Sequence, residues 1–467
     1  MNENESDALG HNRRDFLKGG SAATLMTMLG GVELFAQTNA TPAGETKAPA
    51  VKIKVAVIGL GAWGREIINT LTRMPHADDP IEADIAAVCD TYPAFLKRGG
   101  NAAPGAAQTP DYKTILDNKD IKAVVIATPT FQHKEIALAA LKAGKHVYCE
   151  APLAGSIEDA RDIALAAKAA RHLAFQAGLQ MRSDKERLFL LPFVRSGALG
   201  TSLLARAQWH KKTNWRSTSP NPEREKALNW RLNKETSLGL IGEIGSHQID
   251  QAGWFLKALP TAVTGSGSIN FWKDDRDVPD TVQAVFEFPG GVRMIYDATL
   301  ANSFDSDYEM LYGSDAALMM RVVMGESKAW MFKEVDSPLF GWEVYADKVP
   351  FYKDTGIALV AGKSKPQPVD AQGHPIQPDP LTSTPLFCAL YNFLRNAAEL
   401  DAAAEDYRSS YGADDVAGLM DQLGKIVRRP AADYLEGYQA VVTAVKANEA
   451  VLGNKRVDLK PEWYELS

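Results

Sequence analysis

The sequence predicts an α/β protein of two domains. With 467 residues the chain is longer than one simple core requires. From residue 52 onward, strand-like and helix-like segments alternate, which is typical of a parallel sheet. After about residue 173 this alternation fades, and paired strand patterns replace it. We therefore expect a first domain over residues 51–173 and a second over residues 174–467.

The composition excludes two broad classes of partner. Hydrophobic residues make up 45% of the chain, charged residues 23%, and the formal net charge is −7. A nucleic-acid partner would require a concentrated basic face. No apolar run reaches the roughly 18 residues that a membrane span needs. We expect neither nucleic-acid binding nor a membrane span.

The first fifty residues differ from the rest. The paired arginines Arg13 and Arg14 are followed by Phe16-Leu17-Lys18 and by a weakly apolar stretch over residues 19–36. A linker with Pro42, Gly44 and Pro49 comes next. This order resembles a twin-arginine export signal, with an amphipathic first helix as the alternative. We expect residues 1–50 to be a signal peptide and linker, and the mature protein to be periplasmic or otherwise exported.

A glycine-rich turn lies between a predicted strand over residues 52–58 and a predicted helix over residues 65–74. It reads Gly59-Leu60-Gly61-Ala62-Trp63-Gly64. In a dinucleotide-binding fold the first glycine permits the tight turn, the second admits the pyrophosphate, and the third lets helix and strand pack. The helix N-terminus then offers free N–H groups to the phosphates. The first domain is therefore predicted to be a Rossmann dinucleotide-binding domain.

An acid follows the second predicted strand, over residues 84–89. Asp90 stands near the place where a carboxylate should bond the adenosine ribose hydroxyls. Such a carboxylate repels a 2′-phosphate, which favours NAD over NADP. A solvated turn residue before Tyr92-Pro93 is the alternative.

Further strands are predicted over residues 122–127 and 146–149, with a helix over residues 131–143 ended by Gly144 and another beginning at Ser156. Cys89 and Cys149 would end strands two and five. Three spacings of 4.7–4.9 Å put these strands about 14 Å apart, too far for a disulfide. We expect both to be buried thiols.

Two motifs resemble the glucose–fructose oxidoreductase/inositol dehydrogenase (Gfo/Idh/MocA) family. The first is Thr128-Pro129 with His133, followed by the segment from Ala143 to Glu150 and Pro152. The second is Trp230-Arg231 followed by the segment from Gly239 to Asp250. The resemblance implies that the second, α+β domain is built on a large open, mostly antiparallel sheet, and that the protein forms a dimer or tetramer. A turn at residues 289–291 between two strand-like runs agrees with this.

The second motif contains two acids and a histidine at the spacing of one helix face. Glu243, His247 and Asp250 would share one face of a helix. The resemblance implies that His247 is the catalytic base and that Glu243 bonds the substrate, and a base titrating near neutrality suits this role. A packed core histidine and a metal shared with a carboxylate are the alternatives. No second histidine is within reach, so we expect no metal. Asp250 either orients the imidazole or faces solvent.

The same reasoning assigns the remaining site residues. The expected cofactor contacts are Gly59, Leu60, Gly61, Ala62, Trp63, Gly64, Asp90, Thr128, Pro129, His133, Glu150 and Arg231. The expected substrate contacts are Arg182, Trp230 and Asp250. The aromatic and basic stretch over residues 209–216, with Trp230, would either stack on a pyranose or pack the domain interface.

One position departs from the family pattern. The usual Glu-Lys-Pro, whose lysine assists proton removal, reads Glu150-Ala151-Pro152 here. Either His247 acts alone, or Lys211, Lys212 or Arg182 takes the place of the lysine.

The resemblance implies an NAD-dependent oxidoreductase acting on a ring hydroxyl of a sugar or glycoside, with 3-oxidation of a glycoside as the leading interpretation. Because free NAD is scarce outside the cytoplasm, we expect the cofactor to be tightly bound. The alternatives are an NAD-dependent glycosidase that uses transient oxidation and elimination, and a sugar-binding protein without catalysis.

Overall fold

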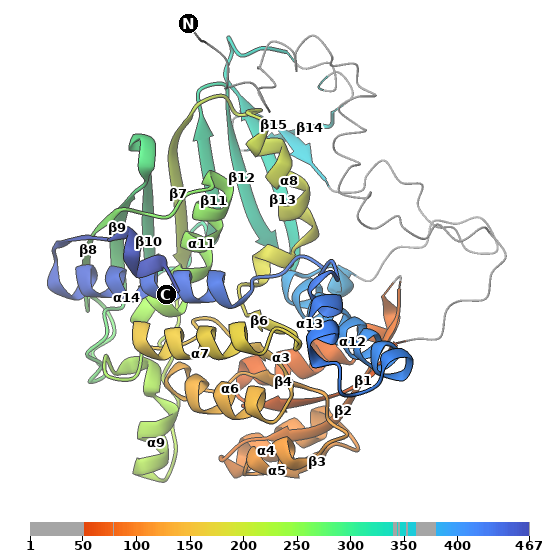
Figure 1. Cartoon of the computed structure of the whole chain (residues 1–467). Helices are drawn as coiled ribbons and strands as arrows, with labels where there is room; N and C mark the ends of the chain where they lie inside the picture. Colours follow the sequence, from red (N-terminus) through yellow and green to blue (C-terminus); the bar gives the residue numbers. More distant parts are fainter. Residues whose placement is uncertain are drawn as a thin grey trace, which may run out of the picture.

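The computed structural model describes residues 51–77, 79–339, 343, 346–351, 354–360 and 380–466. The predicted signal segment over residues 1–50 lies outside the described residues. Two sheets, one of six strands and one of ten, organise the described chain (Figure 1). No helix of the described part is long and apolar enough to cross a membrane.

The first sheet confirms the predicted Rossmann-type architecture. Its strands are β1 (Val51–Ile58), β2 (Ile81–Cys89), β3 (Ala107–Thr109), β4 (Ala123–Ile126), β5 (His146–Cys149) and β6 (Phe175–Ala177). All pair in parallel, in the order β3-β2-β1-β4-β5-β6. Strands β2 and β5 are three places apart, and Cys89 and Cys149 are free and buried, as predicted. Strand β4 is buried throughout, because helices cover both faces of a doubly wound sheet.

The helices of this domain lie close to the predicted ranges, and local sequence signals mark several of their ends. They are α3 (Ala62–Leu71), η1 (Met74–His76), α4 (Pro93–Ala102), α5 (Lys113–Asp117), η2 (Thr130–Gln132), α6 (His133–Lys142) and α7 (Ile157–Ala169). The Ser156 hydroxyl caps α7 by accepting from the Asp159 N–H. Gly144, with φ +73°, follows the end of α6. Helix α3 starts directly after Gly61, three residues before the predicted start.

The second sheet is the large, mostly antiparallel one that the resemblance implied. Its strands are β7 (Ser202–His210), β8 (Ala262–Ser268), β9 (Thr281–Glu287), β10 (Arg293–Thr299), β11 (Asp307–Gly313), β12 (Ala316–Val323), β13 (Glu326–Lys333), β14 (Lys348–Phe351), β15 (Asp354–Leu359) and β16 (Arg456–Asp458). They follow the order β14-β15-β13-β12-β11-β7-β10-β9-β8-β16, in which β7 and β10 are parallel. The predicted turn at residues 289–291 joins β9 to β10, with positive φ at Gly290 and Gly291.

One face of this sheet is covered by helices. Along β10, Met294, Tyr296 and Ala298 are buried, whereas Ile295 is 40% exposed. The second-domain helical segments are η3 (Gln180–Ser183), α8 (Lys185–Arg195), α9 (Pro222–Leu228), η4 (Trp230–Leu232), α10 (Gly239–Glu243), α11 (Gly245–Leu256), η5 (Pro289–Gly291), η7 (Pro380–Thr382), α12 (Pro385–Tyr411), α13 (Val416–Gly424), α14 (Tyr434–Gly453) and η8 (Pro461–Tyr464). The alternation along β10 is that of a sheet packed on one side only.

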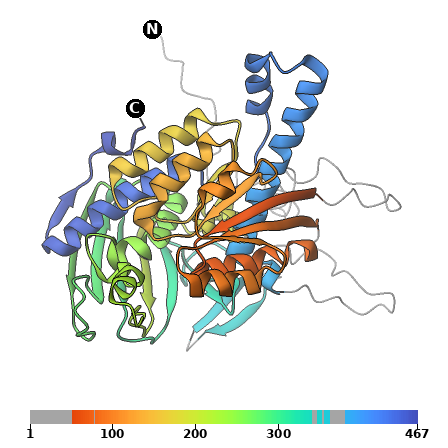
Figure 2. The same cartoon turned by 90° about the horizontal axis from the view of Figure 1, so that it is seen from below.

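Two features cross the predicted domain boundary at residue 173. Strand β6 belongs to the first sheet, and α12, far along the chain, packs against β1 and α3 (Figure 2). The ring centroids of Tyr148 and Phe393 lie 5.7 Å apart, and the Gln176 amide donates to the Ala389 carbonyl oxygen over 3.0 Å. The C-terminal part of the chain therefore completes the core of the first domain.

Candidate active site

The glycine-rich turn has the steric properties of a phosphate cradle. Gly59 has φ +94°, and a Cβ there would lie 2.5 Å from the Ala127 carbonyl oxygen. A Cβ on Gly64 would lie 1.9 Å from the Gly59 carbonyl oxygen. At Gly61, by contrast, a Cβ would meet no atom within 4 Å. Packing thus requires the outer two glycines, while the middle one borders open space where a pyrophosphate can approach.

Asp90 braces this turn from the end of β2. Its Oδ2 accepts from the Leu60 N–H and its Oδ1 from the Tyr92 N–H, both over 2.7 Å. Each carboxylate oxygen has a second lone pair, so the group can still accept from ribose hydroxyls. The contact of Asp90 with the ribose remains a prediction. Its hydrogen bonds to the Leu60 and Tyr92 N–H groups are an additional, structural role.

The turns after β4 and β5 carry polar atoms that have no partner among the described residues. The Thr128 Oγ1 and the Glu150 Oε1 are buried without a hydrogen bond. Buried polar atoms are normally paired, so each of these is suited to a ligand. Together with the glycine turn and Asp90, these residues fit a dinucleotide lying along the carboxyl ends of β2, β1, β4 and β5.

His133 holds these two turns together. Its Nδ1 lies 3.0 Å from the Pro152 carbonyl oxygen and its Nε2 2.9 Å from that of Thr128. The residue is 1% exposed, and burial lowers the pKa of its imidazole. The predicted cofactor contact of this ring is therefore corrected: both nitrogens face protein carbonyls, and the ring positions Thr128.

Glu150 is a buried carboxyl at the carboxyl end of β5. Burial raises its pKa to about 7, although the Trp63 indole, the Ala151 N–H and the Tyr148 hydroxyl favour the ionised form. A Cβ on Gly178 would lie 2.6 Å from the Glu150 Oε2, so only glycine leaves room there. A carboxyl group that changes its protonation state near neutrality thus lies next to Ala151.

Glu243 connects the second domain to the first. Its Oε2 accepts from the Thr130 hydroxyl over 3.1 Å, and its Oε1 accepts from the Ser237 hydroxyl and the Leu238 N–H over 3.2 and 3.3 Å. Burial raises the pKa of Glu243, while the charge of Arg231 opposes this shift. Sequence reasoning missed Thr130 and Ser237, because Thr130 lies 113 residues from its partner and no local pattern marks it.

Trp230 lies in the domain interface. It is 8% exposed, its ring makes an edge contact with Phe131 at 6.3 Å between centroids, and the Arg231 guanidinium carbon lies 4.3 Å from its ring centre. Trp230 therefore packs in the interface, and its substrate contact remains a prediction. Arg231 is exposed, so its guanidinium remains available to a ligand. Desolvation by the surrounding protein lowers its pKa.

The helix that was predicted to carry the three catalytic groups is broken. Helix α10 ends at Glu243, Ile244 has φ −115° and ψ −52°, and α11 begins at Gly245. A Cβ on Gly245 would lie 3.0 Å from the Tyr296 ring, so glycine lets α11 approach the sheet there. Glu243 and Asp250 consequently bond to different parts of the protein.

His247, in the first turn of α11, keeps a free imidazole. Neither of its ring nitrogens has a hydrogen-bond partner among the described residues, and the side chain is partly exposed. Burial lowers its pKa from the ordinary 6.5, and the Asp250 charge opposes this shift. The ring is therefore neutral at neutral pH and able to accept a proton.

Arg182 and Asp250 bond each other. The guanidinium donates through Nε and Nη2 over 2.9 and 2.8 Å, and the two side chains are 15% and 9% exposed. Glu436 lies 3.6 Å from the same guanidinium. Both residues line a pocket of about 330 Å³ between α8, α11 and α14. Their substrate contacts remain predictions, and the ion pair between them is an additional role.

Two of the predicted substitutes for the family lysine, Arg182 and Lys212, contact other side chains. The Lys212 Nζ lies 5.1 Å from the Phe271 ring centre, and Lys211 is exposed. Trp209 and Trp215 pack against the core, with ring centroids 6.5 Å apart. The stretch over residues 209–216 is thus largely structural. Among the described residues, no group of three His, Cys, Asp or Glu side chains is arranged to hold a metal ion.

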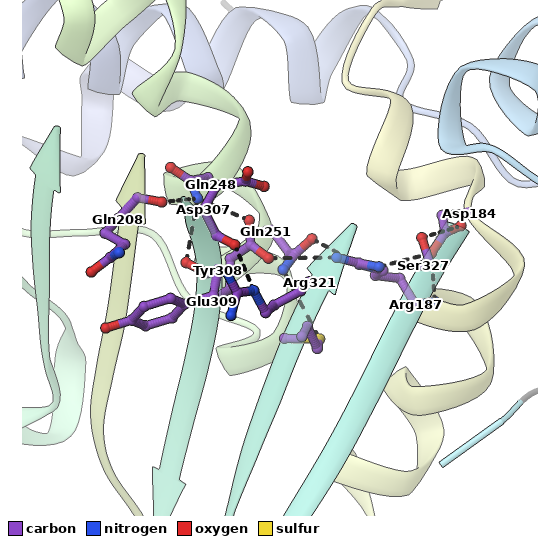
Figure 3. Close-up of polar contacts among 11 residues, drawn as sticks. Asp184, Arg187, Gln208, Gln248, Gln251, Asp307, Tyr308, Glu309, Arg321 and Ser327 are labelled. Carbon is purple, nitrogen blue, oxygen red and sulfur yellow. Dashed lines mark hydrogen bonds and ion pairs between the residues drawn. The ribbon is translucent and has the colours of Figure 1, made fainter. Parts of the chain in front are cut away.

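A buried polar network fixes α11 to the second sheet (Figure 3). Arg187 is fully buried and lies 3.3 Å from the Gln251 Oε1, 3.4 Å from the Asp184 Oδ2 and 3.5 Å from the Glu309 Oε2. Gln248, next to His247, donates to the Glu309 Oε1 over 3.1 Å. The sheet thereby sets the position of the helix that carries His247.

Comparisons with known families identify the two domains. Residues 53–178 match the Gfo/Idh/MocA description "Oxidoreductase family, NAD-binding Rossmann fold", and residues 192–319 match "GFO/IDH/MocA C-terminal domain". Among solved structures, the oxidoreductase domain protein from Kribbella flavida has a TM-score of 0.66 at 19% identity, covering 88% of this chain and 100% of that one. Levoglucosan dehydrogenase in complex with NADH and L-sorbose has 0.63 at 20%, covering 87% and 99%. These structures share the fold.

Curated relatives align over shorter segments. Inositol 2-dehydrogenase of Arthrobacter sp. (strain FB24) is 35% identical over 161 residues, 34% of this chain and 46% of that protein. Levoglucosan dehydrogenase of Pseudarthrobacter phenanthrenivorans is 34% identical over 203 residues, 43% and 50%. A glycosyl hydrolase family 109 protein of Shewanella sp. (strain ANA-3) is 29% identical over 227 residues, 44% and 47%. The chain thus spans about half the length of these relatives.

Proposed function

Because the chain belongs to the Gfo/Idh/MocA family of oxidoreductases and contains an NAD-binding Rossmann domain, we propose that it oxidises a ring hydroxyl of a sugar or glycoside, with position 3 of a glycoside favoured. One observation carries the proposal. The acid of the family motif, Glu243, is bonded to Thr130 of the NAD-binding domain, and His247 follows with an unpartnered ring. The bond supports a role for this motif beside the dinucleotide crevice, with His247 as the proton acceptor.

The residues that would hold NAD lie along one edge of the first sheet. The backbone around Gly61 would bind the pyrophosphate, Asp90 the adenosine ribose, and Thr128 and Glu150 the nicotinamide end. Bound NAD supplies the acceptor for the hydride that leaves the carbinol carbon. The hydroxyl proton would pass to a ring nitrogen of His247.

The proposal must also explain how a proton is removed when Ala151 replaces the family lysine. A methyl group at Ala151 cannot exchange a proton, Arg182 is paired with Asp250, and Lys212 lies against the Phe271 ring, while Lys211 is exposed. We propose that His247 is the only base, since its lowered pKa keeps the ring neutral at neutral pH. Glu243 would orient the sugar while remaining bonded to Thr130 and Ser237.

Export and a resident cofactor belong to the same proposal. The Arg13-Arg14 segment would direct the folded protein out of the cytoplasm with NAD already bound. An enzyme that keeps its cofactor must return the hydride, either to a second substrate or to the same one. We further propose that the protein is a homodimer or homotetramer.

A second function is favoured by one relative. The glycosyl hydrolase family 109 protein is 29% identical over 227 residues, which supports an NAD-dependent glycosidase that oxidises, eliminates and reduces again. The two functions share NAD, Glu243 and His247. They differ in their products, since the glycosidase releases an aglycone and leaves the cofactor in its starting state.

Purified mature protein without added cofactor tests both functions. The near-ultraviolet band of reduced nicotinamide is recorded before and after addition of sugars and glycosides, with mass spectrometry of the products and His247→Ala as control. A rise with a keto-sugar product supports the oxidoreductase, and aglycone release without lasting reduction supports the glycosidase. No turnover of any compound in the panel, even with NAD supplied, would contradict both and favour a sugar-binding protein without catalysis.

A further inference from the structure

A segment of the second domain reaches across to the first at two separate places. The Arg224 Nη1 donates to the Thr91 carbonyl oxygen over 3.2 Å, and its guanidinium carbon lies 4.9 Å from the Tyr92 ring centre. Six residues further along, Trp230 contacts Phe131. Thr91 and Tyr92 follow β2, whereas Phe131 follows β4. Arg224 lies on α9, and Trp230 follows this helix in η4.

The span of this segment matches the width of the dinucleotide crevice. Helix α9 has 7 residues, and at 1.5 Å per residue it is about 10 Å long. In the first sheet β1 separates β2 from β4, so their ends are two spacings, roughly 10 Å, apart. The contacts of Arg224 and Trp230 thus lie after β2 and β4, on either side of β1, whose end leads into the glycine turn. In this fold the dinucleotide lies at that position.

The segment is braced as a stiff unit. The Ser217 N–H donates to the Asn229 Oδ1 over 2.8 Å, and the Asn229 amide donates back to the Ser217 carbonyl oxygen over 2.9 Å. Arg216 and Glu225 form an ion pair at 3.8 Å. Asn221 caps α9 by accepting from the Arg224 N–H over 2.8 Å. These bonds join the two ends of residues 217–229, so the segment can move as one piece.

The contact at Arg224 is the weaker of the two anchors. The hydrogen bond to Thr91 is exposed, and Arg224 and Tyr92 are only partly buried, where a cation–π contact is weak. The opposite anchor, Trp230, is buried in the interface. The segment is thus fixed at one end and detachable at the other. Its detachable end rests on Tyr92, whose N–H donates to Asp90.

We propose that residues 217–230 form a strap that retains NAD in the crevice, and that the Arg224 contact with Thr91 and Tyr92 holds it shut. Release of the cofactor requires this contact to open. The strap is a positioning element outside the proton chemistry. The inference rests on the NAD site of the proposed function and not on the sugar it oxidises.

The strap is tested by measuring the rates at which NADH dissociates from the protein and binds to it. Protein loaded with NADH is mixed with excess NAD, and loss of energy transfer from tryptophan to NADH is followed by stopped flow. Arg224→Ala is expected to release NADH at least tenfold faster and also to bind it faster, because an open strap removes a barrier in both directions. Lys226→Ala, an exposed cation on the same helix, is the matched control and should keep both rates.

Three results would overturn the strap. Equal release rates for wild type and Arg224→Ala, with circular dichroism confirming the fold, would show that the contact does not limit release. Faster release with unchanged or slower binding would instead make Arg224 a direct cofactor contact. Failure of the wild type to bind NADH would remove the site itself. Failure of the sugar assay alone leaves the rate difference intact, so failure of the proposed sugar oxidation is distinguishable from failure of the strap.

Discussion

Thr130, in the turn after β4 of the NAD-binding sheet, donates its hydroxyl hydrogen bond to Glu243 of the second domain over 3.1 Å. Both residues are buried, at 3% and 7% exposure. The bond couples the geometry of the family motif to the docking of the two domains. Any movement of one domain relative to the other changes the position of the Glu243 carboxyl, and with it the start of α11.

Thr130→Val is expected to lower kcat/KM for hydride transfer about tenfold. The change keeps the shape and removes the donor, and a buried acceptor left without its partner costs about 1–3 kcal/mol. Thr130→Ser, which keeps the hydroxyl, should remain within about twofold of wild type. The measurement is steady-state NADH formation. Equal activity of the valine and serine variants would show that the bond does not position Glu243.

Gly61→Ala is expected to abolish tight NAD binding without destabilising the protein. A Cβ at this position meets no protein atom within 4 Å, and the local φ of −57° suits any residue. The methyl group would occupy the space in which the pyrophosphate approaches the backbone. We expect the Kd for NAD, measured by calorimetry, to rise at least about tenfold.

The control for this prediction is Gly155→Ala, where a Cβ also meets no atom within 4 Å. Both variants should melt within a degree or so of wild type when no cofactor is present. If the Gly61 variant binds NAD normally, the glycine turn is not the pyrophosphate site.

Activity is expected to fall on the acidic side of a pKa below 6.5. His247 must be neutral to accept a proton, and burial lowers its pKa, so activity is full at neutral pH and declines as pH falls through that lowered value. Asp250→Asn removes the charge that raises this pKa and should shift the decline to still lower pH. The profile of log kcat/KM against pH reports both. A decline centred near 7 would instead point to Glu150, whose pKa is about 7.

Asp250→Ala is expected to destabilise the protein by about 3–5 kcal/mol, because it leaves the largely buried Arg182 without its bidentate partner. Arg182→Ala should cost a similar amount, and the double variant should cost less than the sum of the two. Urea unfolding measures all three. The exposed pair Lys425–Asp421 offers the control, since Asp421→Ala should change stability by less than about 1 kcal/mol. Additive losses would refute the pairing.

Local signals were sufficient for the elements that build the site. The strand before Gly59, the glycine turn, the capped start of α7 at Ser156 and the turn at Gly290 all depend on neighbours a few residues away. The usual strand order also predicted three spacings between strands two and five, and hence that Cys89 and Cys149 form no disulfide. Prediction was wrong where it assumed one continuous helix through Glu243, His247 and Asp250. The sequence carries their spacing, but the break at Ile244 arises where α11 packs on the second sheet.

The sequence by itself therefore determined the fold class, the NAD-binding turn and the residue types available for proton transfer. Tertiary structure alone decided how they are used: Arg182 pairs with Asp250, His133 joins two turns, Trp230 packs the interface, and Arg224 rests on Tyr92. It also brought α12 onto the first sheet. The physical reason is the separation along the chain of the residues that interact. Periodicity and turn chemistry act between residues close in the chain, whereas these contacts depend on how finished elements dock, and no short pattern records that.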